Sequence, residues 1–136
     1  MMVTIAIGGI LLAIAIGAYG NMREDTRVDS AKEQIASLLQ QARLNALSSG
    51  NLQTVTFDWA NDTVAGIAID NSIDLQKIAC TASPPTLTNT GTKNFTFSRR
   101  GTGTSSSIHI SMPGSSRVGV ITVNGTTGRI AIKDSC

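Results

Sequence analysis

Few side chains in this chain of 136 residues could do chemistry. His109 is the single histidine, and it lies in an alternating run that is typical of a β-strand. No Gly-x-Ser-x-Gly, His-Glu-x-x-His or phosphate-loop motif accompanies it. The run Arg100-Gly-Thr-Gly-Thr104 is rich in glycine, but it lacks the following helix that a nucleotide-type anion site needs. The sequence therefore predicts no catalytic residue, no cofactor and no metal site, and we expect a protein that is not an enzyme.

Charge is distributed unevenly, although the formal net charge is only +2. Residues 51–92 carry four aspartates against one lysine, and residues 93–136 carry six cations against one aspartate. The candidate contact residues of the basic segment are Arg99, Arg100, Arg117, Arg129 and Lys133. Two interpretations stay open: oppositely charged faces that dock successive subunits, or a basic surface that contacts nucleic acid. Aromatic residues make up only 4% of the chain, which leaves little for stacking bases.

An uncharged run occupies residues 1–22 and is almost wholly apolar up to Ala18. About 20 helical residues span the ~30 Å hydrocarbon layer of a bilayer. A secretory signal peptide is the alternative, but nothing basic precedes the run and the helical pattern continues beyond it. We therefore expect a membrane-spanning helix over residues 1–22.

The same helix is expected to continue over residues 23–50 with one apolar face. Apolar side chains recur there at steps of three and four residues, at Val28, Ala31, Ile35, Leu38, Leu39, Ala42 and Ala46. Gly50 suits the left-handed position that ends a helix. The charges of this segment balance, and we interpret them as a solvated face formed by Arg23, Arg27, Lys32, Arg43, Glu24, Asp25, Asp29 and Glu33.

After Gly50 the period of apolar residues changes from 3.6 to 2. We expect six or seven short antiparallel strands within residues 51–136, at 52–58, 63–70, 75–80, 94–98, 107–112, 117–123 and 129–133. The first two flank a turn at 59–62, whereas 81–92 reads as a loop. A long N-terminal helix packed on a C-terminal antiparallel β-sheet domain belongs to the α+β class.

The residues carry a resemblance to a known superfamily. Met2-Val-Thr-Ile-Ala-Ile-Gly-Gly-Ile-Leu-Leu-Ala-Ile-Ala-Ile16 resembles the N-terminal helix of type IV pilins and type II secretion pseudopilins. Segments 95–104, 108–110 and 118–130 resemble the GspH/FimT branch of minor pilins and minor pseudopilins. The N-terminal run is highly specific for the superfamily, while Thr127-Gly-Arg-Ile130 is moderately specific for the branch.

The chain departs from the family pattern at its start. Family members are made with a short basic leader that ends in glycine and is cleaved, which exposes a methylated phenylalanine a few residues before a glutamate. These features would lie upstream of Met1, so we expect the numbering to begin at a processed or misassigned start. A proline often interrupts the helix of the family, and here Gly17 and Gly20 leave a local weak point instead.

The resemblance implies a filament subunit held by its helix. Before assembly the helix would lie in the bacterial inner membrane as a single pass, with the β-rich domain in the periplasm. In a pilus or pseudopilus it would pack against the helices of other subunits, which keeps its apolar surface from water. The residues expected in that filament core are Ile5, Ile7, Gly8, Gly9, Ile10, Leu11, Leu12, Ile14 and Ile16.

Cys80 and Cys136 are the only thiols. In an oxidising periplasm an even pair most simply forms one disulfide, which would tie the last residue to the middle of the domain. The alternative is two unpaired thiols near the surface.

The leading function is a structural subunit, a minor pilin or pseudopilin of a type IV pilus or type II secretion filament. The alternative is a DNA-binding minor pilin for DNA uptake, because the resemblance implies DNA contact through a C-terminal Gly-Arg-x-Arg element. Here Gly128 and Arg129 are present, but Ala131 replaces the second arginine and Lys133 is the nearest substitute.

Overall fold

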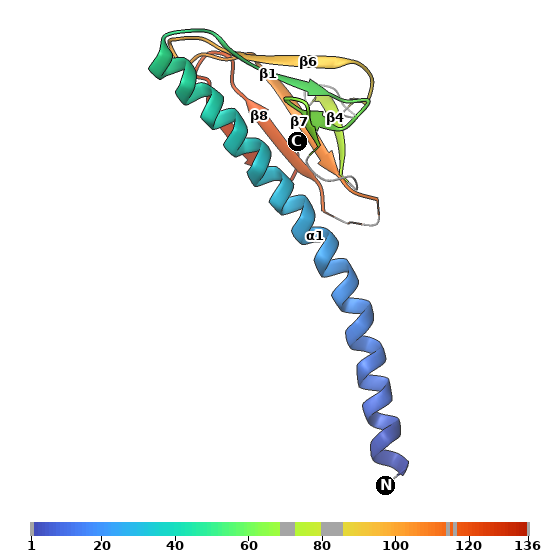
Figure 1. The fold of residues 1–136 in the computed structure, drawn as a ribbon. Coiled ribbons are helices and arrows are strands. Elements are labelled where there is room, and N and C mark those ends of the chain that lie inside the picture. The colour runs from blue at the N-terminus through green and yellow to red at the C-terminus, as the bar shows by residue number, and fades with distance from the viewer. Residues whose placement is uncertain (1, 69–72, 80–85, 114, 116, 136) are drawn as a thin grey trace.

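The computed structural model describes residues 2–68, 73–79, 86–113, 115 and 117–135, with the side chains of α1 described from Arg23 onward, except Glu24. One helix, α1, runs without interruption over Met2–Ser49, and Gly50 follows it with a φ of 67°. The expected long helix and its glycine stop are therefore confirmed. Figure 1 shows the first half of α1 projecting from the sheets and the second half lying across them.

Nine short strands follow α1 in the described residues, rather than the six or seven expected. They are β1 (Gln53–Asp58), β2 (Thr63–Val64), β3 (Ile67–Ala68), β4 (Asp74–Ala79), β5 (Thr86–Thr88), β6 (Thr92–Phe97), β7 (Ser106–Ser111), β8 (Gly119–Val123) and β9 (Ile130–Lys133).

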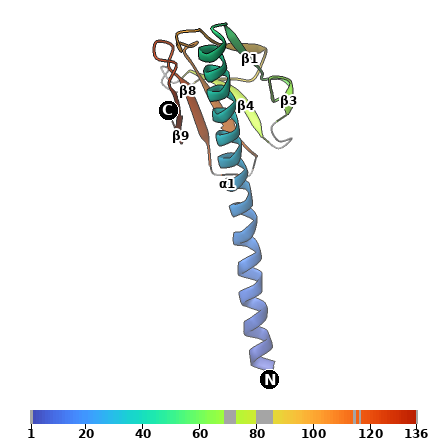
Figure 2. The same ribbon diagram turned by 60° about the vertical axis from the view of Figure 1, so that its left-hand side comes forward.

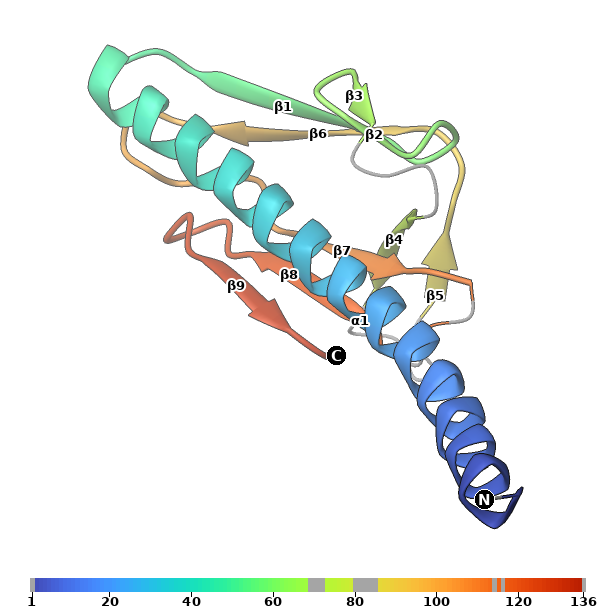
Figure 3. The ribbon, with the colours of Figure 1, turned by 60° about the horizontal axis from the view of Figure 1, so that its bottom comes forward.

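The strands form two antiparallel sheets. The four-stranded sheet has the order β3-β2-β1-β6, and the five-stranded sheet has the order β5-β4-β7-β8-β9. Figures 2 and 3 show α1 lying against both sheets. The α+β class and the packing of a helix on antiparallel strands are confirmed.

Two segments differ from the expected strand pattern. Residues 63–70 do not form one strand, because Ala65 and Gly66 both adopt positive φ and turn the chain between β2 and β3. The left-handed conformation costs a non-glycine residue about 1 kcal/mol, so alternation alone did not reveal this turn. The expected loop at 81–92 contains β5, which pairs with β4.

The core lies between α1 and the sheets. Val28, Ala31, Ile35, Leu39 and Ala46 of the expected apolar stripe are buried, while Leu38 and Ala42 pack against its edge. The core also holds an aromatic cluster of Phe57, Trp59, Phe95 and Phe97. The ring of Phe57 stacks on Trp59 at 5.4 Å and meets Phe95 edge-on at 4.9 Å. These rings are therefore structural and do not form an exposed stacking platform.

Candidate interaction surface

Two turns meet beside the carboxyl end of α1. One turn follows β6 and closes with a hydrogen bond from Gly101 N to Ser98 O at 2.9 Å. The other joins β8 to β9, where the Asn124 carboxamide accepts hydrogen bonds from the backbone N–H groups of Thr126 and Thr127. A side chain at Gly128 would overlap the carbonyl of Gly101, so glycine is required where these turns touch.

Arg43 of α1 fastens the two turns together. Its Nε donates to Gly101 O at 3.2 Å, and its Nη2 donates to Thr127 O at 3.1 Å. One guanidinium thus satisfies carbonyls from two turns that are distant in sequence. The interpretation of Arg43 as part of a solvated face was therefore wrong, because the turns approach the helix there.

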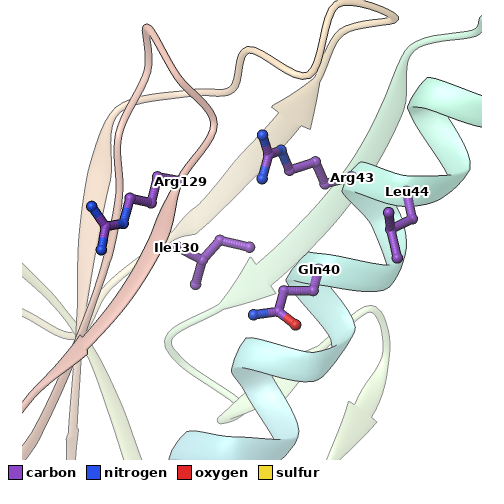
Figure 4. Close-up of a pocket in the computed structure, with 5 residues that line it drawn as sticks. All are labelled: Gln40, Arg43, Leu44, Arg129 and Ile130. Atoms are coloured by element: carbon purple, nitrogen blue, oxygen red, sulfur yellow. The ribbon is translucent and has the colours of Figure 1, made fainter.

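A groove of about 320 Å³ opens between α1 and β9 at this place. It is lined by Gln40, Arg43, Leu44, Arg129 and Ile130. Figure 4 shows Gln40 and Ile130 pointing toward one another, whereas the side chain of Arg129 extends away from the helix. Leu44 and Ile130 supply apolar walls, and two arginines supply positive charge. Such a lining suits a partner that presents a carboxylate beside an aliphatic side chain.

Three of the five expected contact cations lie in the segments that meet here, and one of them, Arg129, lines the groove. Arg99 and Arg100 are exposed in the turn after β6, and Arg129 is exposed directly before β9. Together with Arg43 they form what we call the basic end. The sequence places no aspartate or glutamate in residues 43–53, 96–105 or 124–130, which build this end. Its positive charge is therefore not neutralised by the segments that carry it.

The other two cations lie at the opposite end of β8 and β9. Lys133 is paired in register with Val120, three residues along the ladder from the pair of Val123 with Ile130. Arg117 Nη1 lies 3.5 Å from the Asp29 carboxylate of α1, and its Nε lies 4.0 Å from that of Asp25. The five cations thus occupy two separate places, and Arg117 is already paired inside the molecule.

Lys32 is the largest departure from the expected solvated face. It is only 6% exposed, its Nζ lies 2.7 Å from Asp29 Oδ1 and 2.8 Å from Asp134 Oδ1, and its stem fills the space above Gly119. Burial lowers the pKa of Lys32, but the hydrogen bonds to Asp134 and Asp29 outweigh this effect and raise it above the usual value. The ion pair with Lys32 in turn lowers the pKa of Asp134.

These contacts join three carboxylates and two cations into one group. We call this group the base cluster, and its members are Asp25, Asp29, Lys32, Arg117 and Asp134. Ser115 joins it by donating a hydrogen bond to Asp25 Oδ1 at 2.7 Å. A signal for Lys32 was present in the sequence, because it stands four residues after Val28 and four before Ala36, within the apolar stripe. Gly119 inside a strand was a second signal, since glycine there marks close approach of another group.

His109 lies in β7 opposite Val120. Burial lowers its pKa, and the nearby charge of Asp74 opposes this effect. Its Nδ1 is buried without a hydrogen-bond partner among the described residues. In that part of the chain, no group of three or more His, Cys, Asp or Glu side chains could hold a metal ion.

The remaining expected site residues lie outside the described parts. Cys80 and Cys136 are not described, so their disulfide stays a prediction. The side chains of the filament-core residues at 5–16 are likewise not described, and the division at 22 and 23 stays a prediction. Within the described part of the chain, no helix is both long and apolar enough to cross a membrane.

A long helix lying across antiparallel sheets is the pilin-like architecture. A family model described as Type II transport protein GspH matches residues 31–127. The chain therefore belongs to the GspH family and is a type IV pilin-like minor pseudopilin. A comparison with curated proteins found no match.

Two solved structures share the fold. Both are crystal structures of the type IV minor pilin FimU from Pseudomonas aeruginosa, in space groups P21 and P65. Each is 18% identical to this chain, with TM-scores of 0.56 and 0.53. The matches cover 82% and 77% of this chain and 92% and 91% of FimU. At this level of identity they establish the fold of the chain.

Proposed function

We propose that this protein is a structural subunit of a type IV pilus or type II secretion filament. It is not an enzyme. Residues 1–22 anchor it in the inner membrane before assembly and pack against neighbouring helices afterwards. The β-rich domain faces away from the filament core and contacts other subunits.

One observation carries this proposal. Figure 1 shows the first half of α1 projecting from the sheets, and the contacts of its described side chains with the strand domain begin at Asp25. Residues 2–22 of this helix span roughly 30 Å. The sequence of that projecting segment is uncharged up to Met22. An apolar helix of this length needs either lipid or other helices around it, and a filament core supplies the second.

Removal of residues 1–22 tests the proposal. We expect the remaining chain to be a soluble monomer, because the stripe from Val28 to Ala46 and the two sheets keep their own core. The full chain should require detergent or filament partners. The readouts are membrane fractionation and size-exclusion chromatography with light scattering. A truncated chain that stays bound to membranes, or a full chain that is freely soluble as a monomer, would refute the proposal.

DNA uptake is a second candidate, favoured by the basic end alone. Binding would rest on phosphate contacts, because the aromatic rings of the core are not available for stacking. We expect weak binding, micromolar or poorer, whose logarithm falls by ~0.9 per phosphate contact for each unit of log salt.

Fluorescence anisotropy of labelled duplex DNA with the full chain in detergent, at two salt concentrations, tests this candidate. Arg129→Ala should weaken binding, whereas Lys93→Ala, which removes a cation far from the basic end, should not. Absence of binding at low salt eliminates the candidate. Tight binding that is insensitive to salt would contradict the phosphate-contact account.

A further inference from the structure

The two described sheets end in four edge strands, and three of these are protected from pairing with another chain. β3 has two residues and β5 has three, and short edge strands are one way in which proteins prevent such pairing. β6 is covered at its end, where Thr104 N donates to Thr96 O at 3.0 Å. The fourth edge strand, β9, begins with the uncharged run Ile-Ala-Ile, and no described strand lies beyond it (Figure 3).

The pairing with β8 determines which backbone groups of β9 are open. Asn124 N donates to Arg129 O at 2.9 Å, so these two residues form a hydrogen-bonded pair. Such pairs alternate along an antiparallel ladder with pairs that are not hydrogen-bonded, so Ala131 also bonds to β8. The N–H and C=O groups of Ile130 and Ile132 therefore point away from β8, and no hydrogen bond from another described segment reaches them. We call these groups the open edge of β9.

The helix-facing side of β9 borders the groove. Ile130 lines the groove together with Gln40 and Leu44 of α1, and Figure 4 shows Ile130 and Gln40 pointing toward one another. Ile132, two residues further along, shares this side of the strand and is 47% exposed. A strand added along the open edge would place alternate side chains here, beside the exposed Leu44. Aliphatic side chains suit these positions, because they remove apolar surface from water.

The opposite side of β9 is positively charged. The side chain of Arg129 extends away from the helix in Figure 4, and Lys133 is exposed at the other end of the strand. Ala131 lies between them on the same side, by the alternation of a strand. Opposite charges on paired strands attract and like charges repel. Carboxylates therefore suit the side chains of an added strand that lie on this side.

We propose that the open edge of β9 accepts an extended segment of another protein, in which aliphatic and acidic residues alternate, as an added strand. The aliphatic side chains lie in the groove beside Leu44 and Ile130, and the carboxylates lie beside Arg129. Backbone hydrogen bonds to Ile130 and Ile132 supply affinity, and the alternation of side chains supplies specificity. The inference goes beyond the proposed filament function and does not depend on it, because the open edge belongs to the single chain.

A fluorescein-labelled synthetic peptide of alternating valine and glutamate tests the proposal on the full chain in a non-ionic detergent. Fluorescence anisotropy should show saturable binding, and a peptide of alternating valine and lysine should not bind. Arg129→Glu should weaken binding of the glutamate peptide about fivefold, because an attraction between paired strands becomes a repulsion. Lys93→Glu is the matched control, since it makes the same charge change on β6 of the other sheet and should leave binding unchanged.

Methylated peptides separate backbone pairing from charge attraction. In an added strand, alternate N–H groups of the peptide face β9, and a methyl group on these nitrogens blocks pairing. We therefore compare a peptide that is methylated on its valine nitrogens with one that is methylated on its glutamate nitrogens. One of them should lose binding and the other should keep it. Loss at the valine nitrogens indicates an antiparallel strand, and loss at the glutamate nitrogens indicates a parallel one.

Ile132→Pro tests the same pairing from the side of the protein. It removes an N–H of the open edge and no hydrogen bond to β8, and proline is tolerated at such positions of edge strands. Binding of the unmodified glutamate peptide should fall about fivefold, in keeping with the loss of one hydrogen bond, while the unfolding midpoint stays near that of wild type. If this variant unfolds, the methylated peptides decide with wild-type protein.

The proposal is overturned if the unmodified glutamate peptide does not bind wild type, or if the two methylated peptides bind equally. It is also overturned if Lys93→Glu weakens binding as much as Arg129→Glu, or if the lysine peptide binds as well as the glutamate peptide, because the attraction then does not lie at β9. Failure of the filament proposal is read separately, from the fractionation of the chain that lacks residues 1–22.

Discussion

The base cluster and the basic end carry the same kinds of side chain but use them differently. In the base cluster, Lys32 and Arg117 lie against carboxylates of α1 and of the C-terminal strand region. At the basic end, Arg43 holds two turns through their carbonyls, and Arg99, Arg100 and Arg129 are exposed in segments that contain no carboxylate. The difference indicates that the cations of the base cluster are paired within the molecule, whereas three arginines of the basic end remain available for a partner.

The largest loss of stability is expected from a substitution at Gly119, which lies against Lys32 of the base cluster. Gly119→Val places a branched side chain where the stem of Lys32 lies, and overpacking of this kind costs about 1–3 kcal/mol. Chemical denaturation of the full chain in detergent, followed by circular dichroism, measures the change. In a Lys32→Ala background the same substitution should cost clearly less, because space is then free. Equal costs in both backgrounds would show that Lys32 is not the obstacle.

Arg43→Ala should have the next largest effect. It leaves the carbonyls of Gly101 and Thr127 without their donor, and loss of hydrogen bonds to a charged group costs about 1.5–3 kcal/mol before water replaces them. We expect a loss of unfolding free energy of about 1–2 kcal/mol. Gln40→Ala, from the same wall of the groove, is the control and should stay within about 0.5 kcal/mol of wild type.

Lys32→Met separates the contribution of packing from that of charge, because it keeps the aliphatic stem and removes the ammonium group. The partner aspartates are 42% and 77% exposed and can be hydrated, so the cost should be below about 1 kcal/mol. The stability of this variant should also depend less on salt than that of wild type. A large loss would mean that the ion pairs, and not the packing of the stem, hold α1 in place.

Acidification should lower the stability of the folded chain gradually, in two steps. Because the pKa of the half-buried His109 is lowered, the unfolded chain takes up this proton first, and stability falls as the pH decreases below about 6.5. Because the pKa of Asp134 is also lowered, a further loss begins below about pH 4. Thermal unfolding between pH 7 and pH 3.5 measures both. In His109→Gln the first part should be absent, since the chain has no other histidine.

Local patterns predicted the helix and most strands, because each of these elements depends on the spacing of its own apolar residues and on the glycines at its ends. The stripe from Val28 to Ala46, the stop at Gly50 and the last turn at 124–128 needed no knowledge of distant residues. The pairing into two sheets could not be predicted in this way, because β1 pairs with β6 and β4 pairs with β7 across long separations.

The candidate site was predicted less completely for the same reason. Composition identified the basic segment, but only the fold separates Arg117 from Arg129 and brings Arg43 beside Thr127. Lys32 and Gly119 each carried a sequence signal of close packing, but they are 87 positions apart, and no local pattern pairs one with the other. Whether a charged residue of a helix faces solvent or packs against the rest of the domain therefore cannot be predicted before the opposing surface is known.

The central claim is that the exposed arginines of the basic end contact a partner subunit. It is tested most directly by measuring filament assembly in variants whose stability is normal. The measurement is the amount of full-length chain in sheared filaments from cells that express wild type, Arg99→Ala/Arg100→Ala or Lys133→Ala, together with the unfolding midpoint of each. We predict that the double variant keeps its midpoint, because the exposed arginines serve a partner, yet is depleted from filaments, while Lys133→Ala matches wild type in both. Normal incorporation of the double variant, or a loss that follows reduced stability, would contradict the account.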